Sequence, residues 1–144
     1  MINDDTIKLL RECNAGVKMG VSSIDEVLEH VTADKLRILL VEYKDAHEKL
    51  GNRTHVLLNK YHDDEKDPHP IAKVMSWMKI NMKLMQDEKD AHIADLITDG
   101  CNMGIKSLCR YLNQYKAADE ESKSITKELI KIEEELMVKL RPYL

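Results

Sequence analysis

MGVSSIDEVL, at residues 19–28, returns 84 positions later as MGIKSLCRYL, at residues 103–112. Met, Gly, Ser and Leu coincide between the two stretches. Around both, stripe residues step by alternating three and four, the spacing of a helix face that packs against partner helices. The eight stripe positions of the first region fall on the eight of the second, from Ile7 on Ala91 to Val31 on Tyr115. The repeat therefore predicts a duplicated helical unit.

A short break follows each copy, and a second helix with the same rhythm follows each break. We predict helices over 5–31 and 33–61 in the first half, and over 87–115 and 119–141 in the second. Each pair is expected to form an antiparallel hairpin, because the breaks are only a few residues long. The stripe of the helix over 33–61 comprises Leu36, Leu40, Tyr43, His47, Leu50, Thr54, Leu57 and Tyr61.

A connecting segment over 62–86 separates the two hairpins and is long enough to run along a bundle. Its second part has an amphipathic pattern that predicts a crossover helix over 70–85. Two hairpins with one long crossover define an all-α four-helix bundle rather than a simple up-down-up-down chain. We expect a single domain over 1–144, divided into a hairpin over 5–61, the crossover over 62–86 and a hairpin over 87–144.

The composition supports one helical domain and argues against several partner classes. The chain has 144 residues, no Phe, eight Met and a formal net charge of -4. An acidic balance offers no basic surface to a phosphate backbone, so we expect no nucleic-acid partner. No apolar run approaches the length of a membrane span, and three cysteines without CxxC spacing suit reduced thiols, so we expect a cytoplasmic protein.

With these elements, the chain resembles ferritin-like proteins, and more narrowly short helical-bundle proteins of clostridia and related Firmicutes. The resemblance covers nearly the whole chain. It rests on MGVSSI in the first helix, KVMSWMKINM in the crossover, IADLITDGCNMGI in the following helix and the terminal RPYL. It implies a ferritin-like four-helix bundle and says more about fold than about function.

Ferritin-like di-iron proteins carry inward carboxylates and Glu-x-x-His motifs, which together hold two metal ions. No Glu-x-x-His occurs in this chain, and Asn14 and Thr98 stand where single Glu ligands are expected. Amide and hydroxyl groups bind transition metals poorly, so the metal layer is expected to be degenerate. The alternative is a non-standard site for iron, manganese or zinc that uses His47, Glu48 and Glu133.

The purely structural interpretation of the same layer is a buried polar network. We expect Asn14, His47 and Thr98 to form hydrogen bonds across the helices and to fix helix register, as single polar core positions do in coiled coils.

Methionines on one face of the crossover form a second candidate site. Flexible thioether side chains suit irregular or exchangeable surfaces, so this face is a candidate interface for a homodimer or a protein partner. Packing against the protein's own bundle is the alternative. The interface candidates are Met75, Trp77, Met78, Met82, Leu84 and Met85.

No nucleophile motif or phosphate-binding loop is present in the sequence. We therefore predict a non-enzymatic structural or protein-interaction role without a cofactor, with metal binding as the alternative.

Overall fold

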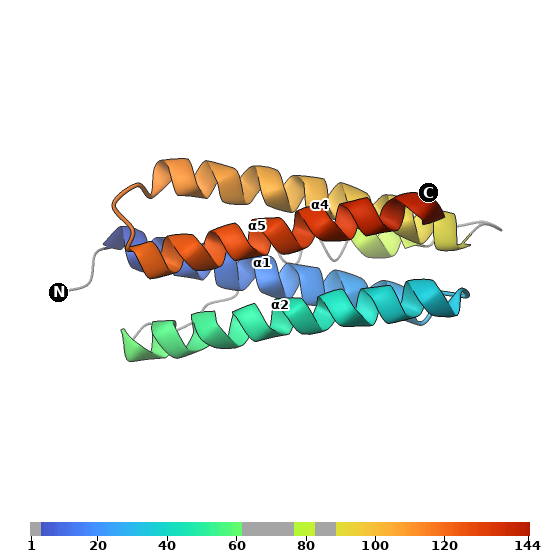
Figure 1. The fold of residues 1–144 in the computed structure, drawn as a ribbon, viewed down its shortest axis with the longest axis horizontal. Helices are drawn as coiled ribbons and strands as arrows, with labels where there is room; N and C mark the ends of the chain where they lie inside the picture. Colours follow the sequence, from blue (N-terminus) through green and yellow to red (C-terminus); the bar gives the residue numbers. More distant parts are fainter. Residues whose placement is uncertain (1–3, 62–76, 83–88) are drawn as a thin grey trace.

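A computed structural model of the chain describes residues 4–61, 77–82 and 89–144. The described part is all-α, and Figure 1 shows four long helices packed side by side. The observed bounds of these helices lie within three residues of the bounds expected from the apolar stripes. Each helix ends one to three residues earlier than expected. The elements are α1 (Asp4–Leu28), α2 (Asp34–Lys60), α4 (Lys89–Gln114), α5 (Glu120–Leu140) and the short 3-10 helix η1 (Arg141–Tyr143).

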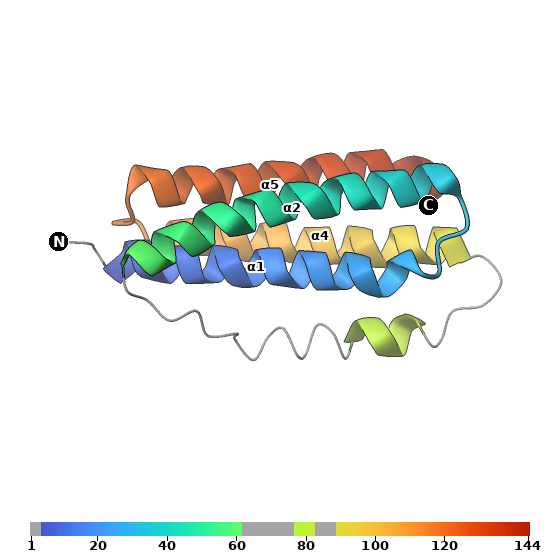
Figure 2. The ribbon, with the colours of Figure 1, turned by 90° about the horizontal axis from the view of Figure 1, so that it is seen from below.

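The helices form an antiparallel bundle in the order α1, α2, α5, α4. Each contacts the next around this ring, and α1 also contacts α5 across the diagonal. In Figures 1 and 2, α1 and α5 run in one direction and α2 and α4 in the other, so every neighbouring pair is antiparallel. α1 and α2 therefore form one antiparallel hairpin, and α4 and α5 form another.

Because α2 and α4 run in the same direction, the chain must return along the whole bundle between them. Figure 2 shows the helical residues 77–82 on this path, beside α1 and α4. Met78 and Met82 from this piece are 1% and 9% exposed and pack into the bundle core. The rest of the expected crossover helix over 70–85 lies outside the described residues.

The predicted stripes form the core. Every stripe position of α2 from Leu36 to Leu57 is buried. The buried apolar residues fall into two clusters, one around Leu36, Leu40 and Ile93 and the other around Leu10 and Ile125. Between Tyr43 in the first cluster and Leu50 in the second, α2 carries the buried polar residue His47. The bundle therefore has a polar layer near its middle.

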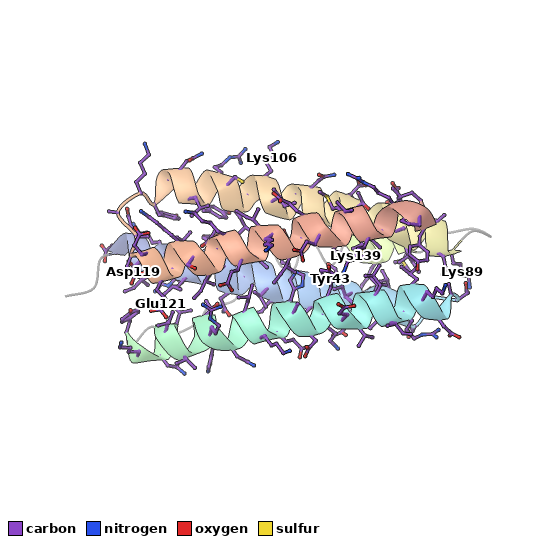
Figure 3. The ribbon with its side chains drawn as sticks, in the orientation of Figure 1. Tyr43, Lys89, Lys106, Asp119, Glu121 and Lys139 are labelled. Atoms are coloured by element: carbon purple, nitrogen blue, oxygen red, sulfur yellow. The ribbon has the colours of Figure 1, made fainter. Side chains whose placement is uncertain are left out.

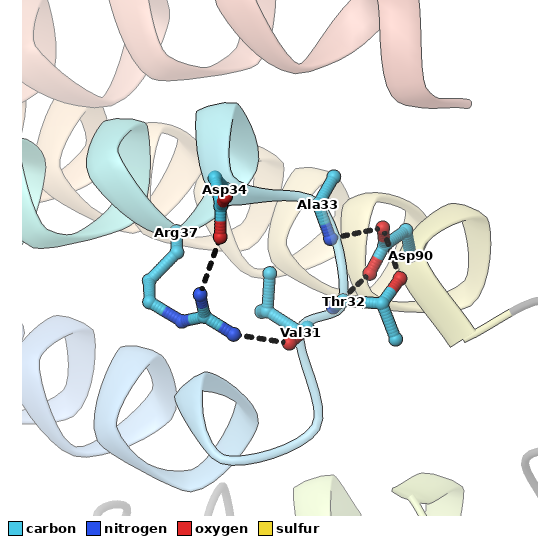
Figure 4. A network of polar contacts seen from close by, with 6 residues as sticks. All are labelled: Val31, Thr32, Ala33, Asp34, Arg37 and Asp90. Carbon is cyan, nitrogen blue, oxygen red and sulfur yellow. Dashed lines mark hydrogen bonds and ion pairs between the residues drawn. The ribbon is translucent and has the colours of Figure 1, made fainter.

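The duplication extends to the ends of the bundle, where each hairpin turn is held by the other hairpin. Asp90, at the start of α4, accepts hydrogen bonds from the backbone N–H groups of Thr32 and Ala33, both at 2.9 Å, and from the Thr32 hydroxyl (Figure 4). Thr6, at the start of α1, accepts one at 2.8 Å from the backbone N–H of Asp119. Thr6 and Asp90 are 84 positions apart, so equivalent residues stabilise equivalent turns.

The two hairpins also contact each other through their second helices. Lys139 of α5 places its Nζ 5.2 Å from the ring centroid of Tyr43 on α2, a cation–π arrangement (Figure 3). Further along, Arg53 Nη1 and Glu128 Oε2 lie 2.6 Å apart. These contacts join α2 to α5.

In the part of the chain that the structure describes, no helix is long and apolar enough to cross a membrane.

Candidate functional site

A histidine and a glutamate face each other in the polar layer. His47 of α2 and Glu133 of α5 are 1% and 6% exposed. His47 Nε2 lies 3.7 Å from Glu133 Oε1, which is within ion-pair range but too long for a direct hydrogen bond. The two residues are 86 positions apart and occupy equivalent places in the two hairpins. The offset is 86 rather than 84 because α4 ends two residues later than the equivalent of α1, and this shifts the following helix by two residues.

A hydrogen bond at the other ring nitrogen of His47 fixes the tautomer of the neutral ring. Nδ1 lies 2.6 Å from the backbone carbonyl oxygen of Tyr43, one turn earlier on α2. A carbonyl oxygen only accepts, so Nδ1 donates, and the neutral ring presents a lone pair at Nε2. Among the described residues, His47 Nε2 and Glu133 Oε2 have no hydrogen-bond partner.

Two acceptors that face each other in a buried site need a proton or a cation between them. Burial raises the pKa of the Glu133 carboxyl above its usual value, and this effect outweighs the opposing influence of the facing His47. The pair therefore binds a proton more readily than an exposed carboxylate does.

Two glycines make room for this pair. A Cβ atom on Gly20 of α1 would lie 2.8 Å from the His47 ring, and one on Gly104 of α4 would lie 2.5 Å from the Glu133 carboxylate. Gly20 and Gly104 are the repeated glycines of the two matching stretches. In each hairpin, the first helix thus has a glycine, which has no side chain, where the second helix points a polar side chain into the bundle.

A cavity of about 270 Å³ lies against the pair, lined chiefly by α1 and α4. Much of its lining repeats with the chain, since five of the seven lining residues from α1 have a lining counterpart 84 positions later on α4. Most of these side chains are small, which keeps the space between the two helices open. The paired lining residues are Gly16 with Gly100, Met19 with Met103, Gly20 with Gly104, Ser23 with Ser107, and Ile24 with Leu108.

Other elements close the cavity. His47, Glu133 and Leu136 form its floor from α2 and α5, and Met78 contributes from residues 77–82. Cys101 of α4 also lines it, and burial together with the nearby Glu133 charge raises the pKa of this thiol. Cys101 is therefore a neutral thiol at physiological pH.

Of the expected polar layer, Asn14 and His47 are buried and Thr98 does not join them as expected. Asn14 is 7% exposed. The Thr98 hydroxyl is buried but has no hydrogen-bond partner in the described ranges, so its expected bond across the helices is absent there. The polar contact of His47 across the bundle is made to Glu133 instead, since Glu133 occupies the matching position on the neighbouring helix.

The expected metal set is also corrected. Glu48 is exposed on the outer face of α2, and its carboxylate lies 3.9 Å from Lys44 Nζ. Only His47 and Glu133 of the three expected ligands come together, because successive residues on a helix point in different directions. Within the described residues, no three His, Cys, Asp or Glu side chains gather in a way that could hold a metal. These residues do not fit a di-metal centre, which needs several carboxylates.

The methionine face is divided by burial. Met78 and Met82 are buried in the core, so packing within the chain, rather than an interface, describes them. Trp77 is partly buried against the same core. Met75, Leu84 and Met85 lie outside the described residues.

Sequence reasoning identified His47 and Glu133 as candidate site residues but missed the cavity beside them. The signal was present in the repeat itself. Three of its four identities, Met, Gly and Ser, line the cavity in both copies. None of these three identities lies on the apolar stripe, so packing along the stripe does not account for them.

No protein-family model, curated protein or solved structure matches this chain.

Proposed function

We propose that this protein is a non-catalytic, ferritin-like bundle that binds a small, largely apolar molecule in the cavity between α1 and α4. The observation that carries the proposal is the cavity of about 270 Å³, which has apolar and small residues on its walls and two polar atoms of the His47–Glu133 pair on its floor. Apolar pockets with a few convergent polar groups are the usual form of small-molecule sites.

The helix arrangement supports the ferritin-like part of the proposal. Two antiparallel hairpins joined by one connection along the bundle are the arrangement of ferritin-like folds. In such bundles, ligand and metal sites form in the core from side chains on facing helices. The His47–Glu133 pair and its cavity occupy that position.

Binding is favoured over covalent catalysis because of the state of the nearest nucleophile. Cys101 lines the cavity, but its raised pKa keeps it in the unreactive thiol form. Binding is also favoured over the protein-interaction role expected from the methionine face, since Met78 and Met82 are buried. A homodimer or a protein partner stays a prediction that these residues do not support.

Titration of the protein with toluene, followed by amide chemical shifts, tests the proposal. A dry cavity of about 150 Å³ binds benzene in another helical protein, so a larger one has room for a single-ring probe. We expect saturable shifts at residues of α1 and α4 that line the cavity. Non-saturable or scattered shifts would contradict the proposal.

A blocking variant and a matched control sharpen this experiment. A Cβ on Gly100 meets nothing within 4 Å, so Gly100→Leu is expected to fill the cavity without a clash and to abolish toluene binding. Lys106 is exposed on the same helix (Figure 3), and Lys106→Leu adds the same side chain outside the cavity. The control is expected to bind toluene like the original protein.

Metal analysis of protein purified without a His tag tests the alternative. His47 Nε2 and Glu133 Oε1 converge at 3.7 Å, which is the observation that favours a metal. Stoichiometric iron, manganese or zinc that disappears in His47→Ala would replace the proposed function with metal binding. Metal absent from the original protein, or unchanged in His47→Ala, agrees with the proposal.

A further inference from the structure

We propose that the cavity selects a primary ammonium group carried on a small apolar body. This inference rests on the proposed binding function and specifies the chemistry of its ligand. It follows from three properties of the cavity: the hydrogen-bonding character of its floor, the charge of its lining and the size of its apolar part.

The floor of the cavity offers acceptors. Because His47 Nδ1 donates to the Tyr43 carbonyl, the neutral ring has only a lone pair at Nε2 to offer. A Glu133 carboxylate likewise only accepts. With Nε2 and Glu133 Oε2 both lacking a hydrogen-bond partner among the described residues, a bound group completes the floor best by donating two hydrogen bonds. An ammonium, with three N–H donors, can donate to both atoms at once.

The charge of the lining selects a cation. In the described part of the chain, the acidic residues that line the cavity are Glu133 on the floor and Glu12 on the wall. No Lys or Arg is present among the described lining residues, so His47 in its imidazolium form is the one positive charge that these described residues can offer. An ammonium beside a buried carboxylate forms a charge-assisted hydrogen bond, which is about twice as strong as a neutral one.

The remaining space suits an apolar body about the size of one ring. The volume is about 270 Å³, and the walls include Ile24, Ile97 and Leu108. Met19, Met78 and Met103 also line it, and their flexible thioethers can adapt to an irregular or aromatic surface. Within the described ranges, the hydroxyl-bearing residues of the lining are Ser23, Ser107 and Tyr111.

An entering ammonium pairs with the ionised form of the Glu133 carboxyl, and burial raises the pKa of that carboxyl. Among the residues that the structure describes, the other titratable groups that face the cavity are Glu12, Cys101 and Tyr111. Burial raises the pKa of both the Cys101 thiol and the Tyr111 hydroxyl, so both stay protonated at neutral pH and supply no proton. Ammonium affinity is therefore expected to increase with pH as the Glu133 carboxyl loses its proton.

Calorimetric titration with benzylammonium, benzyl alcohol and benzoate at about pH 7.5 tests the proposal, because the amine is charged there. The three probes share one ring and differ in the charge of the polar group. We expect benzylammonium to bind at least about tenfold more tightly than benzyl alcohol, and benzoate to bind more weakly than either.

Two matched variants assign the preference to Glu133. Glu133→Gln keeps the shape of the side chain and removes its charge, and is expected to lower benzylammonium affinity at least about tenfold. Glu134→Gln removes the same charge from the next residue, which is exposed, and is expected to leave benzylammonium affinity unchanged. Circular dichroism and thermal unfolding check that both variants are folded.

The outcomes separate this inference from the proposed function. If toluene binds but benzylammonium binds no more tightly than benzyl alcohol, the ligand class is wrong and the cavity site stands. Tighter binding of benzoate, or equal losses in Glu133→Gln and Glu134→Gln, would likewise overturn the ammonium proposal alone. If neither toluene nor benzylammonium binds, both proposals fail.

Discussion

The α1–α2 and α4–α5 hairpins share one plan and differ most where they meet. In both, a glycine on the first helix makes room for an inward polar residue on the second helix, but this residue is His47 in one hairpin and Glu133 in the other. Two identical groups there would face each other across the bundle. Two histidines could not both be charged, and two carboxylates would repel, since like charges in a buried site disfavour ionisation. A duplicated frame therefore needs two different residues at this place.

The largest expected effect comes from making the two hairpins alike at this position. His47→Glu places two carboxylates against each other in a buried layer, and we expect it to lower the free energy of unfolding by about 3 kcal/mol at neutral pH. Urea denaturation followed by circular dichroism measures this.

The exchanged double variant is the control for that prediction. His47→Glu with Glu133→His restores one residue of each kind, and we expect its stability to return to within about 1 kcal/mol of the original protein. If the double variant is no more stable than His47→Glu alone, the two positions are not equivalent in the way the duplication implies.

The repeated glycines give the next largest effect. Gly20→Ala sets a methyl group 2.8 Å from a ring that is held by its Tyr43 hydrogen bond, and is expected to cost about 2 kcal/mol. Gly104→Ala approaches the far end of a carboxylate, which can rotate away, so a cost of about 1 kcal/mol is expected.

Gly100→Ala is the matched control for the glycine variants. Its Cβ meets nothing within 4 Å, so it is expected to gain about 0.5 to 1 kcal/mol from helix propensity alone. Thermal unfolding ranks the three variants. Equal costs for Gly20→Ala and Gly104→Ala would show that ring and carboxylate yield equally.

The turns provide a smaller contrast. Asp90 accepts three hydrogen bonds from the first turn, whereas Thr6 accepts one from the second turn. We expect Asp90→Ala to cost about 1.5 kcal/mol and Thr6→Val about 1 kcal/mol, measured by urea denaturation. A larger loss from Thr6→Val would reverse the order that the hydrogen bonds imply.

The smallest expected effect is a difference in pH dependence between two carboxyl groups. Burial alone would raise the pKa of Asp90, but its hydrogen bonds to Thr32 and Ala33 lower it below its ordinary value. Asp90 therefore contributes stability above its ordinary pKa of 3.8, and this contribution disappears as the pH falls through its lower folded pKa.

Glu133 is expected to show the opposite sign. Burial raises its pKa, so between its ordinary value of 4.5 and its higher folded value the unfolded chain binds fewer protons and stability falls as the pH rises. Unfolding free energies measured across this range should fall more steeply for the original protein than for Glu133→Gln. Parallel profiles would contradict the raised pKa.

The sequence was sufficient for the helices and their order along the chain, and partly for the site. Periodic apolar residues report which helix face is buried, so the stripe from Leu36 to Leu57 was predicted position by position. His47 and Glu133 were both named, but their correspondence was hidden, because the second helices match at an offset of 86 rather than 84. Glu48 was wrongly grouped with them, since adjacency in sequence places side chains on different helix faces.

By itself, the sequence determined the duplication, the four amphipathic helices and a connection long enough to span a bundle. Helix periodicity and chain length are local properties, and they need no knowledge of neighbours. Only the tertiary structure decided that the small residues Gly20 and Gly104 line a cavity, and that His47 and Glu133 face each other beside it. Both features depend on how the two hairpins are rotated against each other, because a cavity and a buried charge pair exist only between residues that packing brings together from distant parts of the chain.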